Sequence, residues 1–268
     1  MKNIQFWNGN KSEIRQKYEY EILLAILKQT QDNVTELPLI NDKTDYPLAE
    51  DEGNVFNHGT DVLVTVAGNE KFVNKPFIAV NQPIAKGLLG YRILITRKDF
   101  NTNSNQSLTD TIKQLKAGIP QTWVDAELFR YNGFKVLEQG NLQQIFTYLH
   151  NGDCDYVSLG ANEVSAIYQG ISKQFTNLSM EQNIVLYYPL PLVFYVNPNH
   201  PLLAERIQNG LDQLTSNGKL DQIFNHYFGD CLASLQLHKR EVIVLSNPNL
   251  PKTLKQAVNP NLLNILSQ

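Results

Sequence analysis

The chain is poor in cysteine, the residue on which disulfide-rich and zinc-thiolate proteins depend. Its 268 residues include two cysteines, two methionines and two tryptophans. Two cysteines are too few for a disulfide framework or for a thiolate zinc site. Cys154 and Cys231 could pair in an oxidising compartment, but we expect two unpaired thiols.

The chain also lacks an excess of positive charge and long apolar runs. Lysine and arginine number 23 against 26 acidic residues, giving a net charge of −3 and a pI near 6.0. No basic stripe is available to neutralise phosphates, so we expect no nucleic-acid partner. Apolar runs such as "EILLAIL" are far too short to span a bilayer.

The start "MKNIQFWNGN" has no apolar core of the kind found in signal peptides. Two interpretations stay open, a cytoplasmic protein or a mature exported form from which the signal peptide has been removed. The resemblance described below favours the exported form.

Sequence motifs for catalysis are missing as well. The chain has no G-x-S-x-G, no Walker loop and no G-x-G-x-x-G, and its five histidines show no H-x-x-x-H spacing. Cys154 lies between Asp153 and Asp155, which would raise the thiol pKa and discourage nucleophilic use. We expect no enzyme activity, no metal and no cofactor.

What the chain does contain is an alternation of short apolar runs and helical patterns, which is typical of an α/β protein. Residues 3–7, 60–66 and 90–96 predict strands, and a long helix is expected from about Ser12. Ser107 and Asp110 predict a capping box for the helix that follows them. Near the end, a helix with Pro201 in its first turn and a short helix over 218–229 are expected.

Three stretches carry a resemblance to a known family. "HGTDVLVTVAGNEKF" resembles a segment with a buried strand followed by T-x-x-R, and "SLTDTIKQLKAGIPQTW" resembles sL-x-D-L-x-G-k-x-V-G-V-x-x-G-T. "NPNHPLLAERIQNGLDQLTSNGKLDQIFNHYFG" resembles a helical ending that closes on K-Y-F-G. Together these segments resemble the type 2 periplasmic binding proteins, in particular the family 3 receptors of amino-acid ABC importers. "PIAKGLLGYRILI", "W-x-D" before "NGFKV" and "GANE" are similar to one bacterial subgroup of them.

The resemblance implies a two-lobed α/β fold. Lobe one would comprise residues 1–95 and 195–268, and lobe two residues 96–194. Two crossover strands, near 93–98 and 192–197, would act as hinges for closure around a ligand bound between the lobes.

In the first lobe, family members grip the ligand carboxylate with an arginine. The matching place here holds Lys71, which either serves as a point charge or is simply a solvated lysine. Arg92 and Arg97 are alternative cations, one of which could pair with a surface carboxylate. The resemblance also makes Thr65 and Asn69, in the same stretch as Lys71, candidates for ligand binding.

In the second lobe, the family's carboxylate-binding Thr or Ser maps onto Thr122, at the start of a helix expected over 123–131. Thr122 and Asp125 also fit a T-x-x-D capping box, which is the favoured role for Asp125. If Asp125 instead points toward the ligand, it suits an amino group.

Both tryptophans lie at junctions between a predicted strand and a turn. Trp123 lies off the apolar stripe of its helix, and Trp7 occupies the analogous place in lobe one. An indole can form one wall of a ligand site and donate one hydrogen bond. We expect at least one of the two to face the ligand.

The family's acidic residue for the ligand amino group would follow the strand "DYVSLG", but that strand ends without a carboxylate. Asn162 and Glu163 come next and could substitute for it. Asn162 also fits a helix N-cap, and Glu163 would be favoured in a first helical turn without any ligand.

These expectations together describe a monomeric receptor in the periplasm. It would close on a small polar solute, an amino acid or a related molecule, and deliver it to the membrane permease of an ABC importer. A ligand-sensing module of a signalling system and a dehydratase-like enzyme on the same fold are the alternatives.

Overall fold

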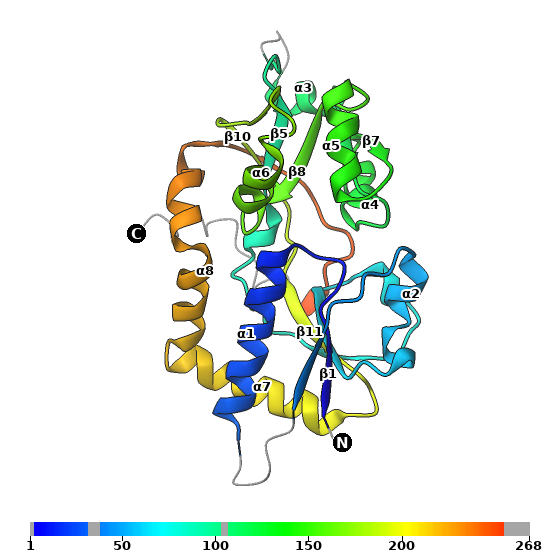
Figure 1. Cartoon of the computed structure of the whole chain (residues 1–268), viewed down its shortest axis with the longest axis vertical. Helices are drawn as coiled ribbons and strands as arrows, with labels where there is room; N and C mark the ends of the chain where they lie inside the picture. The colour runs from blue at the N-terminus through cyan, green and yellow to red at the C-terminus, as the bar shows by residue number, and fades with distance from the viewer. Residues whose placement is uncertain (1–2, 32–37, 103–106, 255–268) are drawn as a thin grey trace. The chain divides into compact units, whose positions relative to one another are not determined.

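The computed structural model describes residues 3–31, 38–102 and 107–254 and divides them into two compact units (Figure 1). Unit 1 comprises the described residues up to 87, together with 191–230 and 249–254. Unit 2 comprises the described residues of 88–190 and 231–248. The chain therefore passes between the units at 87/88, 190/191, 230/231 and 248/249.

Unit 1 is built on a five-stranded sheet with the order β2-β1-β3-β11-β4. Strands β2, β1 and β3 are parallel, and β11 runs antiparallel to both β3 and β4. Its strands are β1 (Ile4–Trp7), β2 (Leu39–Asp42), β3 (Val62–Val66), β4 (Ile78–Val80) and β11 (Leu192–Val196). β3 and β11 are buried along their whole length, which explains their nearly continuous apolar sequences.

Unit 2 is built on a second sheet with the order β12-β10-β5-β8-β6-β7, and β9 pairs with β5. Strands β8, β6 and β7 are parallel, whereas β5 runs antiparallel to β8 and to β10. Its strands are β5 (Tyr91–Arg97), β6 (Lys116–Ile119), β7 (Lys135–Glu138), β8 (Tyr156–Gly160), β9 (Leu178–Met180), β10 (Ile184–Tyr187) and β12 (Glu241–Val244).

Helices flank both sheets (Figure 1). In unit 1, α1 packs against α7, and α7 also contacts β4 and β11. The helices of the two units are α1 (Glu13–Gln29), α2 (Ala49–Gly53), α3 (Leu108–Gln114), α4 (Asp125–Tyr131), α5 (Leu142–Asn151), α6 (Val164–Ile171), α7 (Pro201–Ser216) and α8 (Lys219–Leu235). The short 3-10 turns are η1 (Val55–His58), η2 (Glu70–Phe72), η3 (Leu88–Gly90), η4 (Leu237–Lys239) and η5 (Lys252–Leu254).

Local capping signals explain several helix ends. The Ser107 side chain accepts a hydrogen bond from the Asp110 backbone N–H, which confirms the Ser107 half of the expected capping box; the Asp110 carboxylate accepts from the Ser107 hydroxyl at 2.7 Å. At α5, Asn141 and Gln144 form a full capping box, and Gly152 ends the helix at φ 87°. Pro201 is the first residue of α7, as expected.

The carboxyl-terminal part of the chain differs from the expectation. Helix α8 does not stop at Gly229 but continues to Leu235, because Leu232 and Leu235 bury their side chains in the next two turns. Residues 231–248, assigned to lobe one from the sequence, lie in unit 2 because β12 forms a parallel pair with β10. Strand β5 belongs wholly to unit 2 and β11 wholly to unit 1.

None of the helices that the structure describes combines the length and the apolar character needed to cross a membrane. Cys154 is a buried free thiol, and Cys231 is a partly buried one. The expectation of unpaired cysteines is therefore confirmed.

Candidate functional site

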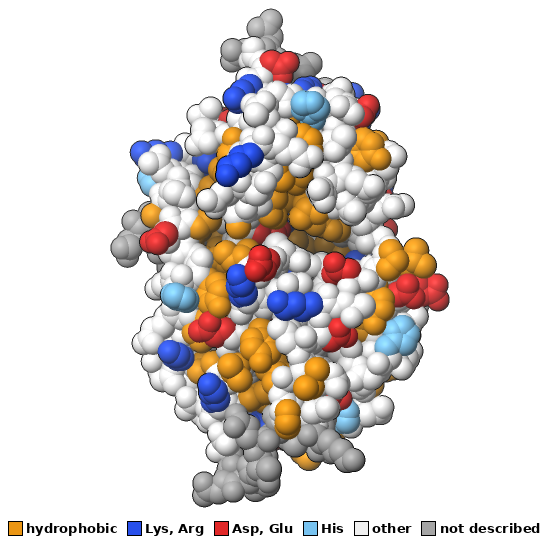
Figure 2. Space-filling view, in the orientation of Figure 1, with side chains coloured by type: hydrophobic (Ala, Val, Ile, Leu, Met, Phe, Trp, Pro, Cys, Tyr) orange, Lys and Arg blue, Asp and Glu red, His pale blue; other side chains and the backbone are white. Residues whose placement is uncertain are grey.

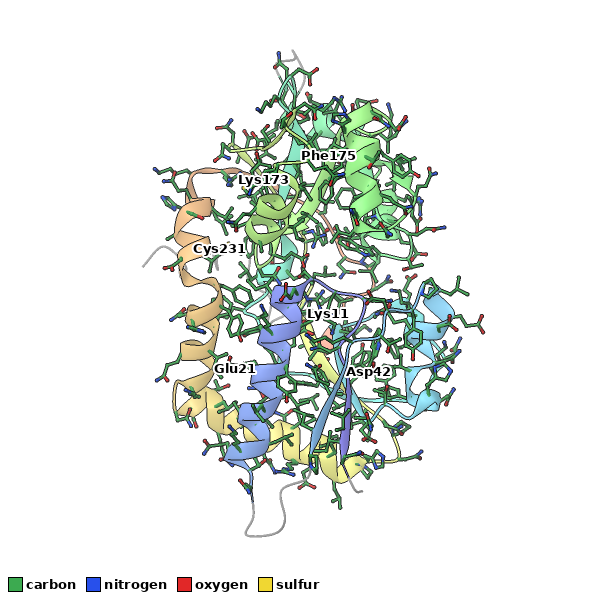
Figure 3. The ribbon with its side chains drawn as sticks, in the orientation of Figure 1. Lys11, Glu21, Asp42, Lys173, Phe175 and Cys231 are labelled. Atoms are coloured by element: carbon green, nitrogen blue, oxygen red, sulfur yellow. The ribbon has the colours of Figure 1, made fainter. Side chains whose placement is uncertain are left out.

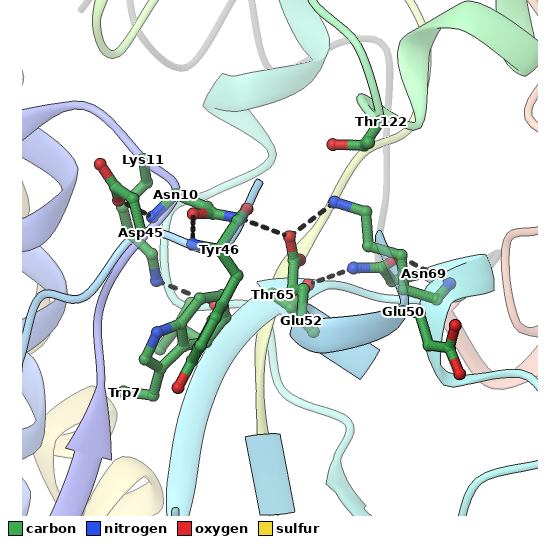
Figure 4. Close-up of polar contacts among 12 residues, drawn as sticks. Trp7, Asn10, Lys11, Asp45, Tyr46, Glu50, Glu52, Thr65, Asn69 and Thr122 are labelled. Carbon is green, nitrogen blue, oxygen red and sulfur yellow. Dashed lines mark hydrogen bonds and ion pairs between the residues drawn. The ribbon is translucent and has the colours of Figure 1, made fainter. Parts of the chain in front are cut away.

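In unit 1, polar side chains gather where β1, β2 and β3 end. Asn10 follows β1 with a left-handed backbone (φ 54°) and ties together two segments that follow β2. Its side-chain amide donates to the Tyr46 carbonyl at 2.8 Å and to Glu52 Oε2 at 3.0 Å, and its oxygen accepts from the Tyr46 N–H at 2.7 Å (Figure 4). Parallel strands present their carboxyl ends at one edge of a sheet, which is where open α/β sheets bind ligands.

Lys71 is held by a carboxylate of its own unit. Its ammonium lies 2.6 Å from Glu52 Oε2, and the two side chains are only 12% and 9% exposed. Neither interpretation made from the sequence describes this arrangement fully, because Lys71 is not a solvated lysine and its charge is already neutralised. A ligand carboxylate would have to compete with Glu52 for it.

Thr65 and Asn69 lie together beside Lys71. The Asn69 amide donates to Thr65 Oγ1 at 2.8 Å, and Asn69 Oδ1 accepts from the Lys71 backbone N–H at 3.1 Å. The second of these bonds caps the 3-10 turn η2. The sequence stretch that suggested Thr65, Asn69 and Lys71 therefore brings all three into contact through one short turn after β3.

The sequence reasoning missed Lys11. It lies between β1 and α1 (Figure 3), with its ammonium 2.7 Å from Glu19 Oε2 and 3.1 Å from the Val64 carbonyl. Burial lowers the pKa of Lys11, while the charge of Glu19 opposes that shift. Glu19 also forms an ion pair with Arg15. Because Glu19 is a carboxylate on the buried stripe of α1, its position in the sequence could have indicated that a cation lies nearby.

Trp7 belongs to the hydrophobic core of unit 1. Its indole is 2% exposed, donates to the Thr44 carbonyl at 2.9 Å and lies 5.7 Å from the Tyr46 ring. A side chain that is enclosed and hydrogen-bonded in this way supports the segment after β2. We therefore assign Trp7 a packing role in place of the ligand contact expected from the sequence.

In unit 2, the segment after β6 has an unusual backbone. Thr122 adopts φ 69°, a left-handed conformation that is uncommon for β-branched residues and easy for glycine. In the motif V-G-V-x-x-G-T, the first glycine corresponds to Gly118. Counting on from Gly118, the second glycine of the motif falls on Thr122 and its threonine falls on Trp123. The backbone of Thr122 favours this register, and Trp123, which is partly exposed, then occupies the motif's threonine position.

The expected capping box between Thr122 and Asp125 is not formed. Helix α4 begins at Asp125 after Val124, with no side-chain cap, and the Thr122 N–H donates to Glu138 Oε1 at 3.3 Å. Asp125 lies instead 2.7 Å from Arg92 and accepts a hydrogen bond from the Tyr188 hydroxyl. A long-range ion pair has replaced the local pattern that the sequence indicated.

Arg92 is the centre of this buried network. Its guanidinium donates to the Ser158 carbonyl at 3.1 Å and to the Leu89 carbonyl at 3.3 Å, and its side chain is 2% exposed. Burial, the largest single influence, lowers the pKa of Arg92, but Asp125, Tyr188 and Glu163 together outweigh it, so the pKa is raised. Arg97, the other cation considered, is tied to the Cys154 carbonyl at 2.7 Å and lies 3.5 Å from Asp155.

Asn162 has a buried amide without a partner. It follows β8, is 1% exposed, and neither its Oδ1 nor its Nδ2 forms a hydrogen bond with the described residues. A Cβ at Gly160 would lie 2.4 Å from Asn162 Oδ1, so the glycine makes room for this amide. The N-cap of α6 is Glu163, with no side-chain cap, so the N-cap role considered for Asn162 is wrong.

Glu163 is 5% exposed, and its charge helps to raise the pKa of Arg92. Arg92, Asp125 and Tyr188 bond to one another, although Arg92 Nε has no partner. The buried hydroxyls of Tyr156 and Tyr187 also lack one, but among the described residues only Asn162 lacks a partner for both polar atoms of its side chain. Buried polar groups are nearly always hydrogen-bonded, so the Asn162 amide requires a partner that the described chain does not supply.

Within the described ranges, no three His, Cys, Asp or Glu side chains are placed to hold a metal ion. Burial, followed by the charge of Asp155, raises the pKa of the Cys154 thiol to about 12, which makes a thiolate nucleophile rare at neutral pH.

Comparison with known proteins identifies similar solved structures only. No protein-family model and no curated protein sequence matches the chain. A Salmonella typhimurium periplasmic binding protein with high arginine specificity aligns with a TM-score of 0.61 and 13% identity, over 85% of this chain and 100% of that one. A periplasmic His/Glu/Gln/Arg/opine family-binding protein from Silicibacter pomeroyi, in complex with lysine, aligns at 0.60 and 12%, over 85% and 98%.

A third structure comes from a signalling protein. It is a histidine kinase sensor domain with similarity to periplasmic binding proteins, with a TM-score of 0.60 and 16% identity, over 85% of this chain and 96% of that one. At these identities, each likeness establishes a shared fold.

Proposed function

Because the chain has the two-lobed α/β fold of the type 2 periplasmic binding proteins, we propose that it is a receptor for a small polar solute. It closes on the solute outside the cytoplasm and delivers it to the permease of an ABC importer. It acts as a monomer and carries out no catalysis. The similar proteins that bind arginine or lysine make an amino acid or a related molecule the first class to test.

One observation carries the proposal in the chain itself: the unsatisfied amide of Asn162, directly after a strand of the parallel part of the unit 2 sheet. An unpaired buried amide lowers stability, so a protein that keeps one usually gains something in function. A hydrogen bond to a bound solute is such a gain. Trp123 and Glu163 are the other proposed contacts in unit 2, and Thr65, Asn69 and Lys71 those in unit 1.

The neutralised cations bear on the class of solute. Lys71 is paired with Glu52 and Arg92 with Asp125, so neither of these two cations is available to grip a carboxylate without losing its partner. A solute with neutral or cationic polar groups fits this arrangement better than one that depends on a carboxylate clamp. Argininamide and agmatine, which lack the carboxylate of arginine, are therefore included in the test below.

The substitution Asn162→Leu tests the proposal, because leucine has a similar volume and no polar atoms. Removing an unsatisfied buried amide is expected to leave stability unchanged or to raise it by about 1 kcal/mol. A solute that raises the melting temperature of the wild type should no longer raise the melting temperature of this variant. Loss of stability with unchanged ligand binding would show that Asn162 is a packing residue, and the main support for the proposal would be gone.

A second function is favoured by the sensor-domain likeness, namely a module that reports the same solute to a signalling partner. Both functions require binding of a solute, so the Asn162→Leu test applies to both. Genes next to the coding sequence separate them, since permease genes indicate import and kinase or cyclase genes indicate sensing.

A further inference from the structure

An elongated groove of about 740 Å³ lies on unit 1, away from every residue proposed above to contact the solute. Its two walls are α1 and α8, and the end of α7 contributes to its floor. The lining residues are Lys17, Tyr20, Glu21, Leu24, Ala25, Lys28, Gln29, Leu214, Asn217, Lys219, Gln222, Ile223 and Tyr227.

The lining residues recur with helical spacing on both walls. On α1 they form a continuous stripe from Lys17 to Gln29, and on α8 they recur at intervals of three and four residues. The α1 stripe is separate from the buried stripe of the same helix, which contains Ile22, Leu23 and Ile26. At a rise of 1.5 Å per residue, the α1 wall is about 18 Å long, the length of a helix of roughly 12 residues.

The floor of the groove is apolar and held in place. Leu214 and Ile223 are almost fully buried there, while Leu24 and Ala25 are partly exposed on the α1 wall. The Tyr227 hydroxyl donates to Glu21 Oε2 at 2.8 Å, and Figure 3 places Glu21 on the side of α1 that faces α8. This bond joins the two walls, so the groove does not depend on an occupant to form.

The charged side chains along the groove are mainly positive. Lys17, Lys28 and Lys219 face a single carboxylate, Glu21, although the protein as a whole carries a charge of −3. Lys17 is paired with Glu13, but Lys28 and Lys219 form no ion pair with the described residues. Asp221, the acidic residue in the first turn of α8, does not line the groove and pairs with Lys86.

We propose that this groove docks an amphipathic helix with acidic flanks, contributed by a partner protein. Its apolar residues, spaced by three and four, would contact the partly exposed Leu24 and Ala25 above the buried floor, and its carboxylates would lie beside Lys28 and Lys219. The space-filling view shows hydrophobic side chains exposed on the lower half of this face, with cationic side chains at their edge (Figure 2). Charge complementarity would set the choice of partner, and the apolar contacts would supply most of the affinity.

Fluorescence anisotropy with three labelled peptides of about 12 residues tests the proposal, the length following from the groove. One peptide is amphipathic with glutamate flanks, the second has the same apolar residues with lysine flanks, and the third is a scrambled acidic peptide. We expect the first peptide alone to bind. Its affinity should fall about tenfold in the Lys28→Glu/Lys219→Glu variant, because reversing two charges removes two attractions and adds two repulsions.

The Lys173→Glu/Lys239→Glu variant is the matched control, because both lysines are exposed on unit 2 and the change in net charge is the same. It should bind the acidic peptide as the wild type does, and Ala25→Trp, which fills the groove, should abolish binding without reversing any charge. Circular dichroism melting confirms that each variant is folded. Equal binding of the basic or scrambled peptide, undiminished binding by the double variant, or binding of dodecanoate but of no peptide would overturn the proposal.

Discussion

Arg92 on β5 and Asp125 at the start of α4 form an ion pair at 2.7 Å inside unit 2, with side chains only 2% and 6% exposed. This pair joins an inner strand of the sheet to a helix that the sequence had suggested would be capped locally. A buried charge that loses its partner is far more costly than a surface charge that does, because water cannot replace the lost interaction.

Asp125→Ala is therefore expected to lower the free energy of unfolding by about 3–5 kcal/mol, because it leaves the Arg92 guanidinium buried and unpaired. Urea unfolding followed by circular dichroism measures this. Arg92→Met/Asp125→Leu, which removes both charges, should recover most of the loss. Lys17→Met, which breaks an exposed pair with Glu13, should have little effect. If Asp125→Ala and Lys17→Met lowered the free energy of unfolding equally, that result would contradict a structural role for the buried pair.

The Glu52–Lys71 pair gives a prediction about ligand preference. Glu52→Gln keeps the shape of the side chain and frees the charge of Lys71, so it should tighten binding of arginine relative to argininamide by about tenfold, or ~1.4 kcal/mol. Isothermal titration calorimetry with both compounds measures the ratio. Glu50→Gln is the control, because Glu50 is exposed and makes no ion pair with the described residues. An unchanged ratio in Glu52→Gln would remove Lys71 from the proposed site.

The comparison between sequence and structure shows where local patterns suffice. The Ser107 cap, Pro201 at the start of α7 and the buried strands β3 and β5 depend on residues close together in the chain, and all were predicted. The clustering of Thr65, Asn69 and Lys71 could also be anticipated, because one short turn brings the three residues together.

The predictions that failed are those that depend on contacts between residues far apart in the sequence. Thr122 and Asp125 fit a capping box, but the Asp125 carboxylate instead pairs with Arg92 and accepts a hydrogen bond from Tyr188, and both partners are distant in the sequence. Trp7 could not be distinguished from a ligand-facing residue, because its enclosure depends on Thr44 and Tyr46. No spacing in the sequence indicated that residues after Gly229 would join the second sheet, since that follows from the β12–β10 pair.

The two thiols provide a prediction about reactivity. Burial raises the pKa of Cys154 to about 12 and also raises the pKa of Cys231, so little thiolate exists at pH 8. With 5,5′-dithiobis(2-nitrobenzoate), the folded Cys231→Ser variant should react through Cys154 at least a hundredfold more slowly than the same variant in urea, in line with the shift from an ordinary thiol. A rate equal to that of the unfolded chain would show that Cys154 is accessible and ionised.

Tyr227 provides a prediction about alkaline stability. Burial, followed by Glu21, raises its pKa from 10.0 to about 12. The folded state therefore holds this proton more tightly than the unfolded state does, and the resulting stability is complete below pH 10 and is lost as the pH rises to 12. The Tyr227→Phe variant has no hydroxyl to ionise. The unfolding free energy of the wild type should therefore fall relative to that of the variant between pH 9 and pH 11. A difference that stays constant over this range would contradict the raised pKa.

The central claim, that the protein binds a small polar solute, is tested most directly by calorimetric titration of the whole chain. The panel comprises the common amino acids, argininamide, agmatine and lysine amide, with Asn162→Leu titrated in parallel. The account predicts one-to-one binding of at least one of these compounds to the wild type and no binding of that compound to Asn162→Leu. Absence of heat and of thermal stabilisation with every compound, in a chain shown to be folded, would contradict it.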